Sequence, residues 1–132
     1  MVVGAARIEL HIHASRSLKQ KRGVVRSLLR RVANRFEVSA AEVEAQDNWQ
    51  IAVIGVAMVG IATPVVERRI ENLIRFIEEQ HLAEVVDHEV EVLVAPLAAY
   101  TDGDSPDGRA FDRRFEAAFG GKAFEDEMEP GA

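Results

Sequence analysis

The sequence predicts an α+β domain over residues 1–94 whose strands and helices follow the order β-α-β-β-α-β. Three observations carry this prediction. Apolar and polar residues alternate in three short stretches, as they do in half-buried strands. A fourth short stretch is apolar on both faces, and two longer stretches repeat apolar residues with the period of a helix. The 132-residue chain has the length of a single domain.

The first strand and helix are predicted from alternation and from a cap. Every second residue in the stretch 2–13 is apolar, which indicates a strand with one buried face. Ser17 followed by Gln20 has the spacing of a capping box, so the first helix begins there and continues to about Phe36. The alternating residues 38–44 then predict a second strand.

The remaining elements complete the fold class. The link between the second strand and the apolar strand 50–60 is too short for a crossover, so these two strands should form an antiparallel hairpin. Thr63 is predicted to cap the second helix, with Pro64 at its first position, and residues 85–94 form the last strand. Right-handed connections then give a ferredoxin-like two-layer sandwich, an antiparallel four-stranded sheet with two helices on one face.

Composition excludes several classes of protein. Apolar residues make up 48% of the chain and charged residues 29%, as in globular domains. The longest apolar stretch is far shorter than the roughly 20 residues that span a bilayer, and the N-terminal residues lack a signal-peptide pattern. The absence of cysteine excludes disulfides and thiolate chemistry. These features predict a cytoplasmic protein without a membrane partner.

Positive charge is concentrated in the first helix. The net charge is −6, yet residues 10–36 contain no acid and eight basic residues. Four of them lie within about 80° of one another around the helix and define the basic stripe: Lys19, Arg22, Arg26 and Arg30. Lys21, Arg31 and Arg35 are expected on its flank. Such spacing suits the phosphates of a nucleic-acid backbone, so RNA is the expected partner.

Two alternatives to RNA remain open for the basic stripe. It can pair with acids, either of a second subunit or of the second helix, such as Glu67 and Glu71, or it can have no partner. Sequence-specific reading of RNA is not expected. An RNA-recognition motif shares this topology, but it stacks bases on aromatic residues of its central strands, where this chain has residues such as Arg7, Glu9 and Val53.

The face of the sheet away from the helices is a second candidate surface. Its apolar centre of Val53, Ala57 and Val59 predicts a contact with a second copy, and hence a dimer. The alternatives are that this face is exposed to solvent or covered by the C-terminal extension. On the same face His11 and Glu44, or Glu9 and Glu91, could meet as metal ligands or as an acid–base pair. Exposed carboxylates are common on strands, however, so the sequence predicts no metal, no cofactor and no catalytic residue.

Two further aromatic features are singled out. Trp49, beside the hairpin turn, is expected to plug the core, with a partner contact as the alternative. Residues 95–132 are predicted to form an acidic C-terminal extension with a short amphipathic helix near 109–119. That helix would present Phe111, Phe115 and Phe119 every four residues, and we expect this stripe to dock on its own domain, a second subunit or a partner.

Three motifs carry a resemblance to a known family. Residues 7–11 (RIELH), 17–22 (SLKQKR) and 46–50 (QDNWQ) occur in the order and spacing of the YlxP-like family of small bacterial proteins. The resemblance covers about residues 1–94. It implies a ferredoxin-like fold and no established activity, and members are often encoded beside translation and ribosome-maturation factors.

These observations together predict a non-enzymatic accessory protein that binds RNA or a ribosome precursor through the basic stripe. The alternative is a dimeric structural or regulatory module that acts through the exposed sheet face and has no nucleic-acid role. No P-loop, dinucleotide-binding glycine pattern or Ser-His-Asp motif is present, so an enzyme is not expected.

Overall fold

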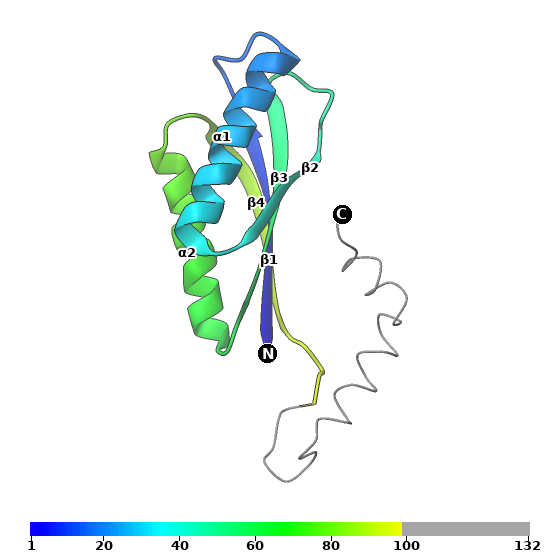
Figure 1. Ribbon diagram of the computed structural model, residues 1–132, viewed down its shortest axis with the longest axis vertical. Helices are drawn as coiled ribbons and strands as arrows, with labels where there is room; N and C mark the ends of the chain where they lie inside the picture. The colour runs from blue at the N-terminus through cyan, green and yellow to red at the C-terminus, as the bar shows by residue number, and fades with distance from the viewer. Residues whose placement is uncertain (99–132) are drawn as a thin grey trace, which may run out of the picture. The chain divides into compact units, whose positions relative to one another are not determined.

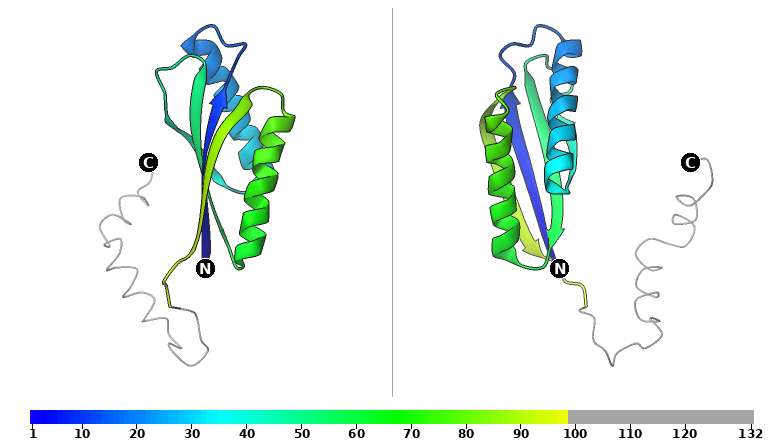
Figure 2. Two further views of the ribbon diagram at one scale, coloured as in Figure 1. Left: turned by 180° about the vertical axis from the view of Figure 1, so that it is seen from behind. Right: turned by 60° about the vertical axis from the view of Figure 1, so that its left-hand side comes forward.

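The computed structural model describes residues 1–98. The elements are β1 (Val2–His11), α1 (Leu18–Phe36), β2 (Ser39–Glu44), β3 (Ile51–Gly60), α2 (Thr63–Glu79) and β4 (Glu84–Val94). The four strands form one antiparallel sheet in the order β2-β3-β1-β4, with β1 and β3 in the centre (Figure 1). Both helices lie side by side on one face of the sheet (Figure 2). The predicted ferredoxin-like fold is therefore confirmed.

The predictions for the C-terminal extension fall almost entirely on residues that the structure does not describe. The predicted helix near 109–119, with Phe111, Phe115 and Phe119, lies outside the described residues, as does nearly all of the 95–132 extension. Within the described part of the chain, neither helix is long and apolar enough to span a membrane.

The core lies between the sheet and the two helices. Alternate residues of β1, among them Ile8 and Leu10, point towards the helices and are fully buried. Leu28 of α1 and Leu73 of α2 pack against them in one continuous cluster. Apolar residues recur every second residue in the strand and every three to four residues in the helices, so each element has one apolar face. Burial of these faces against one another stabilises the two-layer arrangement.

The ends of the helices follow from local hydrogen bonds. Ser17 is the N-cap of α1, and its hydroxyl oxygen accepts a hydrogen bond from the Gln20 amide at 3.1 Å. The Gln20 side chain accepts in turn from the amide of Arg16 at 2.6 Å. The predicted cap of α2 is wrong by one residue. Ala62 is the N-cap and makes no side-chain hydrogen bond, while Thr63 already belongs to the helix.

Two β-bulges change which side chains share a face of the sheet. In β2 the register shifts between Glu42 and Glu44, because the pairing with β3 skips Val43. In β4 the partners of Glu9 and Leu10 are Asp87 and Val85, so one residue between them is left unpaired. An extra residue in a strand reverses the facing of every residue beyond it. Both bulges therefore affect the candidate sites described next.

Candidate functional site

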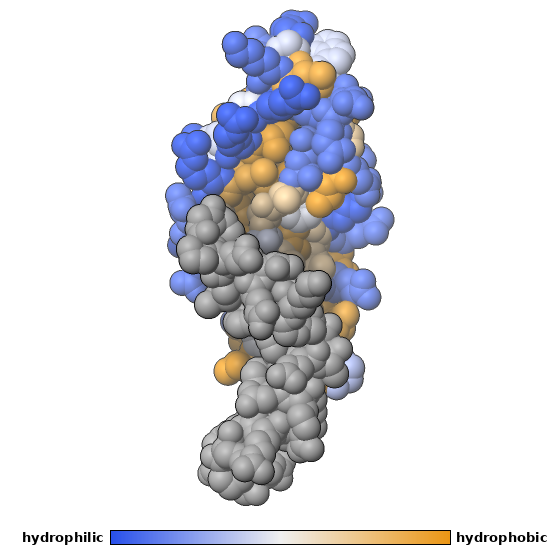
Figure 3. Space-filling model, turned by 45° about the vertical axis from the view of Figure 1, so that its right-hand side comes forward, coloured by the Kyte–Doolittle hydropathy of each residue, from blue (hydrophilic) through white to orange (hydrophobic). Residues whose placement is uncertain are grey.

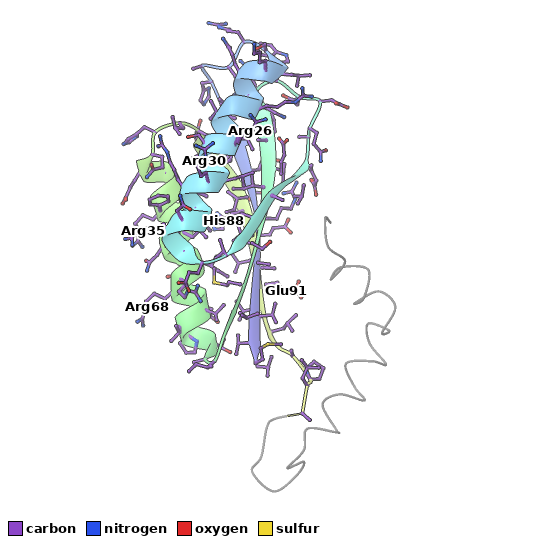
Figure 4. The ribbon with its side chains drawn as sticks, in the orientation of Figure 1. Arg26, Arg30, Arg35, Arg68, His88 and Glu91 are labelled. Atoms are coloured by element: carbon purple, nitrogen blue, oxygen red, sulfur yellow. The ribbon has the colours of Figure 1, made fainter. Side chains whose placement is uncertain are left out.

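The basic stripe is exposed along α1. Lys19, Arg22, Arg26 and Arg30 all have exposed side chains, as predicted for a solvent-facing stripe. Arg26 and Arg30 project from α1, whereas Arg68 belongs to α2 (Figure 4). Within residues 1–98 none of the four forms an ion pair, and in particular none pairs with the acids of α2. In the space-filling view, hydrophilic side chains border a strip of apolar surface on the described domain (Figure 3).

The predicted flank of the stripe is only partly exposed. Arg31 donates a hydrogen bond to the side-chain oxygen of Gln80 at 2.8 Å, and Arg35 lies over the ring of Phe36. Lys21, in contrast, is fully buried with 0% of its surface exposed, so its predicted place on the flank is wrong. It belongs to the apolar face of α1, since Lys21 is four residues before the buried Val25 and in line with it along the helix.

The ammonium group of Lys21 binds the loop between β2 and β3 and the first residue of β3. Its Nζ donates hydrogen bonds to the carbonyl oxygens of Ala45 (2.7 Å), Gln46 (3.3 Å) and Ile51 (3.1 Å). Nζ also lies 3.1 Å from Oε2 of Glu42. That contact is an ion pair without a hydrogen bond, because three donors are already used and the Glu42 oxygen has no donor within the described residues. Lys21 thus neutralises Glu42 and fixes the loop.

The loop that Lys21 holds contains the QDNWQ motif. The side-chain oxygen of Asn48 accepts from the amides of Gln50 and Ile51 at 2.9 and 2.8 Å, which closes the turn before β3. Trp49 is 44% exposed in this loop, so the prediction that it plugs the core is wrong. Two of the motifs behind the family resemblance therefore meet in space, where Lys21 of SLKQKR contacts the loop of QDNWQ.

The bulge in β2 separates Glu42 and Glu44, which strict alternation would place on one face of the strand. Glu42 points to the helix side and reaches Lys21, whereas Glu44 lies on the open face. There Glu44 accepts a 2.8 Å hydrogen bond from the guanidinium of Arg7. This hydrogen bond, followed by the attraction between the charges, holds the pKa of Glu44 below its ordinary value. Glu44 is therefore paired with Arg7, and not with His11 as a metal ligand.

The apolar centre of the open face is smaller than predicted. Val53 is only 2% exposed, which leaves almost none of it for a second molecule to contact. Ala57 is exposed, and Val59 is 61% exposed. Glu9 and Glu91 do not oppose each other, because Glu9 pairs with Asp87 across β1 and β4.

One cluster on the open face escaped sequence analysis. His11 is the cross-strand partner of Glu84, and His13 lies two residues further along the chain. The nitrogen and oxygen atoms that these three side chains offer to a metal all lie within 4.8 Å of one another. Nε2 of His13 is 2.5 Å from Oε2 of Glu84, and the rings of His11 and His13 are 3.8 Å apart between centroids. The His-x-His spacing was the available signal, since a strand places such residues on one face.

The fold and this surface define a ferredoxin-like α+β domain with a positively charged helix. The chain belongs to the DUF503 family of proteins of unknown function, whose model matches residues 3–90. It is 36% identical over 77 residues to the uncharacterized protein YlxP of Bacillus subtilis (strain 168), a match that covers 58% of this chain and 84% of that protein.

Solved structures resemble the chain more distantly. The structural-genomics protein YJCS matches with a TM-score of 0.44 and 14% identity, over 70% of this chain and 99% of that one. A de novo designed protein with a ferredoxin fold also has a TM-score of 0.44, with 10% identity over 76% of this chain and 92% of the design. The assignment of the fold rests on the strand order of the chain itself.

Proposed function

We propose that the protein is a non-enzymatic, cytoplasmic accessory protein that binds RNA through the basic stripe of α1, with ribosomal RNA or a ribosome precursor as the partner. One observation carries the proposal. The four side chains of the stripe are exposed on one helix, and none has an acidic partner within residues 1–98. Like charges at helical spacing repel one another, and a polyanion removes that repulsion.

The arrangement beneath the stripe also supports this proposal. Glu42 lines a small pocket together with Arg22 and Arg26, so its carboxylate could in principle neutralise them. Its ion pair within residues 1–98 is with the buried Lys21 instead. The stripe therefore keeps its own charge available for phosphates. The resemblance to the YlxP-like family, whose members are often encoded beside translation and ribosome-maturation factors, favours a ribosomal RNA partner.

Recognition in this proposal is by charge and backbone shape. On the open sheet face the central positions are occupied by Arg7, Glu9, Val53 and Gly55, which offer no aromatic surface for stacking bases. Phosphate contacts of this kind position a protein on RNA without reading its sequence. We therefore expect little preference between RNA sequences of the same secondary structure.

The salt dependence of RNA binding tests the proposal. If four phosphates are contacted, the logarithm of the binding constant should fall against the logarithm of salt concentration with a slope between about −2.8 and −3.6. The measurement is a fluorescence-anisotropy titration of a labelled ribosomal RNA fragment with the full chain at several salt concentrations. An absence of binding at low salt, or affinity that does not change with salt, would contradict the proposal.

A dimer formed through the open face is the second candidate. Val43, Val59 and Leu93 are all about half exposed or more, and apolar side chains gathered on a sheet favour association. Val53, which was expected at the centre of that contact, is already covered by its own chain. The open face therefore has less support than the basic stripe, which carries four charges without partners in the described domain.

A further inference from the structure

We propose that His11, His13 and Glu84 form a binding site for a divalent transition-metal cation, with Zn²⁺ as the preferred ion. The site is independent of the proposed RNA contact. Two of its ligands, His11 and Glu84, are a cross-strand pair on the open face of the sheet, and His13 lies just beyond the end of β1. None of the three belongs to the basic stripe of α1. All three come from the same edge of the domain, where the end of β1 meets the start of β4.

Strand geometry brings the two histidines together. Ile12, between them, points into the core and is 1% exposed, so His11 and His13 both face outward. Their ring centroids are 3.8 Å apart. His11 ends β1 and His13 lies two residues beyond it, so the two imidazoles can offer two nitrogens to a single ion.

The bulge in β4 supplies the carboxylate. Glu9 pairs with Asp87, and continuing that register would place Val85 opposite His11. The extra residue shifts the register instead, so that Val85 pairs with Leu10 on the buried face and Glu84 pairs with His11 on the open face. Bulges often redirect a side chain beside a functional site in this way.

The donor set selects the class of metal. Two imidazoles and one carboxylate with an open coordination position are typical of zinc and other first-row transition ions, whereas Mg²⁺ and Ca²⁺ prefer oxygen ligands only. The three side chains border a pocket of about 540 Å³ that His81 and Glu78 also line. No lysine or arginine is among the described residues of this pocket, so nearby charge favours a cation.

The fold itself holds the three ligands close together. Nε2 of His13 donates to Oε2 of Glu84 at 2.5 Å, because a carboxylate can only accept. A metal that binds both atoms would replace this hydrogen bond, and the ligand atoms of all three side chains already lie within 4.8 Å of one another.

Isothermal titration calorimetry of the full, untagged chain with Zn²⁺ tests this proposal. We expect one ion per chain, unaffected by excess Mg²⁺. His13→Ala and Glu84→Ala should each weaken binding by at least about tenfold, or about 1.4 kcal/mol. The side chains of His13 and Glu84 are 61% and 59% exposed, so these changes leave the core intact, as circular dichroism would verify.

His88→Ala is the matched control. Like Glu84, His88 is an exposed residue of β4. It pairs with the buried Ile8, however, and so lies on the face of the sheet that carries the helices. Its replacement should leave the Zn²⁺ affinity unchanged. The proposal is overturned if the chain binds no Zn²⁺, or if the folded double variant His11→Ala/His13→Ala binds as tightly as the natural chain.

Discussion

Replacement of Lys21 by methionine should lower the free energy of unfolding by about 3–5 kcal/mol, although it removes a charged residue from a crowded basic helix. The loss arises because Glu42, at 17% side-chain exposure, would keep its charge without a cation. Three carbonyl oxygens would also lose their donor, among them those of Ala45 and Ile51. Urea denaturation followed by circular dichroism measures this change.

Lys19→Met provides the control for that prediction. Lys19 lies two residues earlier on the same helix but is exposed and unpaired within residues 1–98, so its loss should change stability by no more than about 0.5 kcal/mol. The double variant Lys21→Met/Glu42→Gln should recover part of the stability, because it removes the uncompensated charge. A Lys21→Met protein within 1 kcal/mol of the natural chain would show that the network around Nζ contributes little.

The second large effect concerns RNA binding. Reversing two charges of the stripe, in Arg26→Glu/Arg30→Glu, should weaken RNA binding on the order of 100-fold or more at low salt. Two attractive phosphate contacts are lost and two repulsive ones replace them. The slope of the logarithm of the binding constant against the logarithm of salt concentration should decrease in magnitude to about half of its value or less. Both quantities come from the anisotropy titration described above.

A second double variant separates the position of the charges from their number. Arg68→Glu/Arg75→Glu changes two exposed arginines of α2 and shifts the net charge from −6 to −10, as the α1 variant does. We expect its RNA affinity to fall far less than that of the α1 variant. Equal losses in the two variants would mean that net charge alone governs binding, and the basic stripe would then have no special role.

Patterns of hydrophobicity were sufficient to predict the fold. β1 and α1 each bury one face, and their periods of two and nearly four residues are visible without knowledge of the neighbours. The capping pair Ser17 and Gln20 also involves neighbouring residues, and its hydrogen bond occurs as predicted. The spacing of apolar residues and one helix cap, both readable from neighbouring residues, were thus enough to predict most of the architecture.

The predicted exposure of Lys21 is wrong although charged side chains are normally exposed. Its spacing from Val25 and Leu28 already placed it on the buried face of α1. What makes burial tolerable is the set of carbonyl oxygens from residues 45–51, which is distant in sequence and depends on the conformation of the loop. Only the folded chain reveals that compensation.

The cluster of His11, His13 and Glu84 was missed for a related reason. The two histidines share a face by simple alternation, but the third ligand depends on the bulge in β4. The sequence of β4 does not indicate the position of the bulge. The bulge in β2 likewise sends Glu42 and Glu44 to opposite faces, against the alternation in the sequence.

The most direct test of the central claim is to map the RNA contact by nuclear magnetic resonance. The ¹⁵N-labelled full chain would be titrated with a short ribosomal RNA hairpin at low salt, and the shifts of its amide signals followed. The account predicts that the largest shifts fall between residues 16 and 31 of the first helix and its cap. Shifts concentrated at Ala57, Val59 and Glu91 on the open sheet face, or no shifts at all, would contradict it.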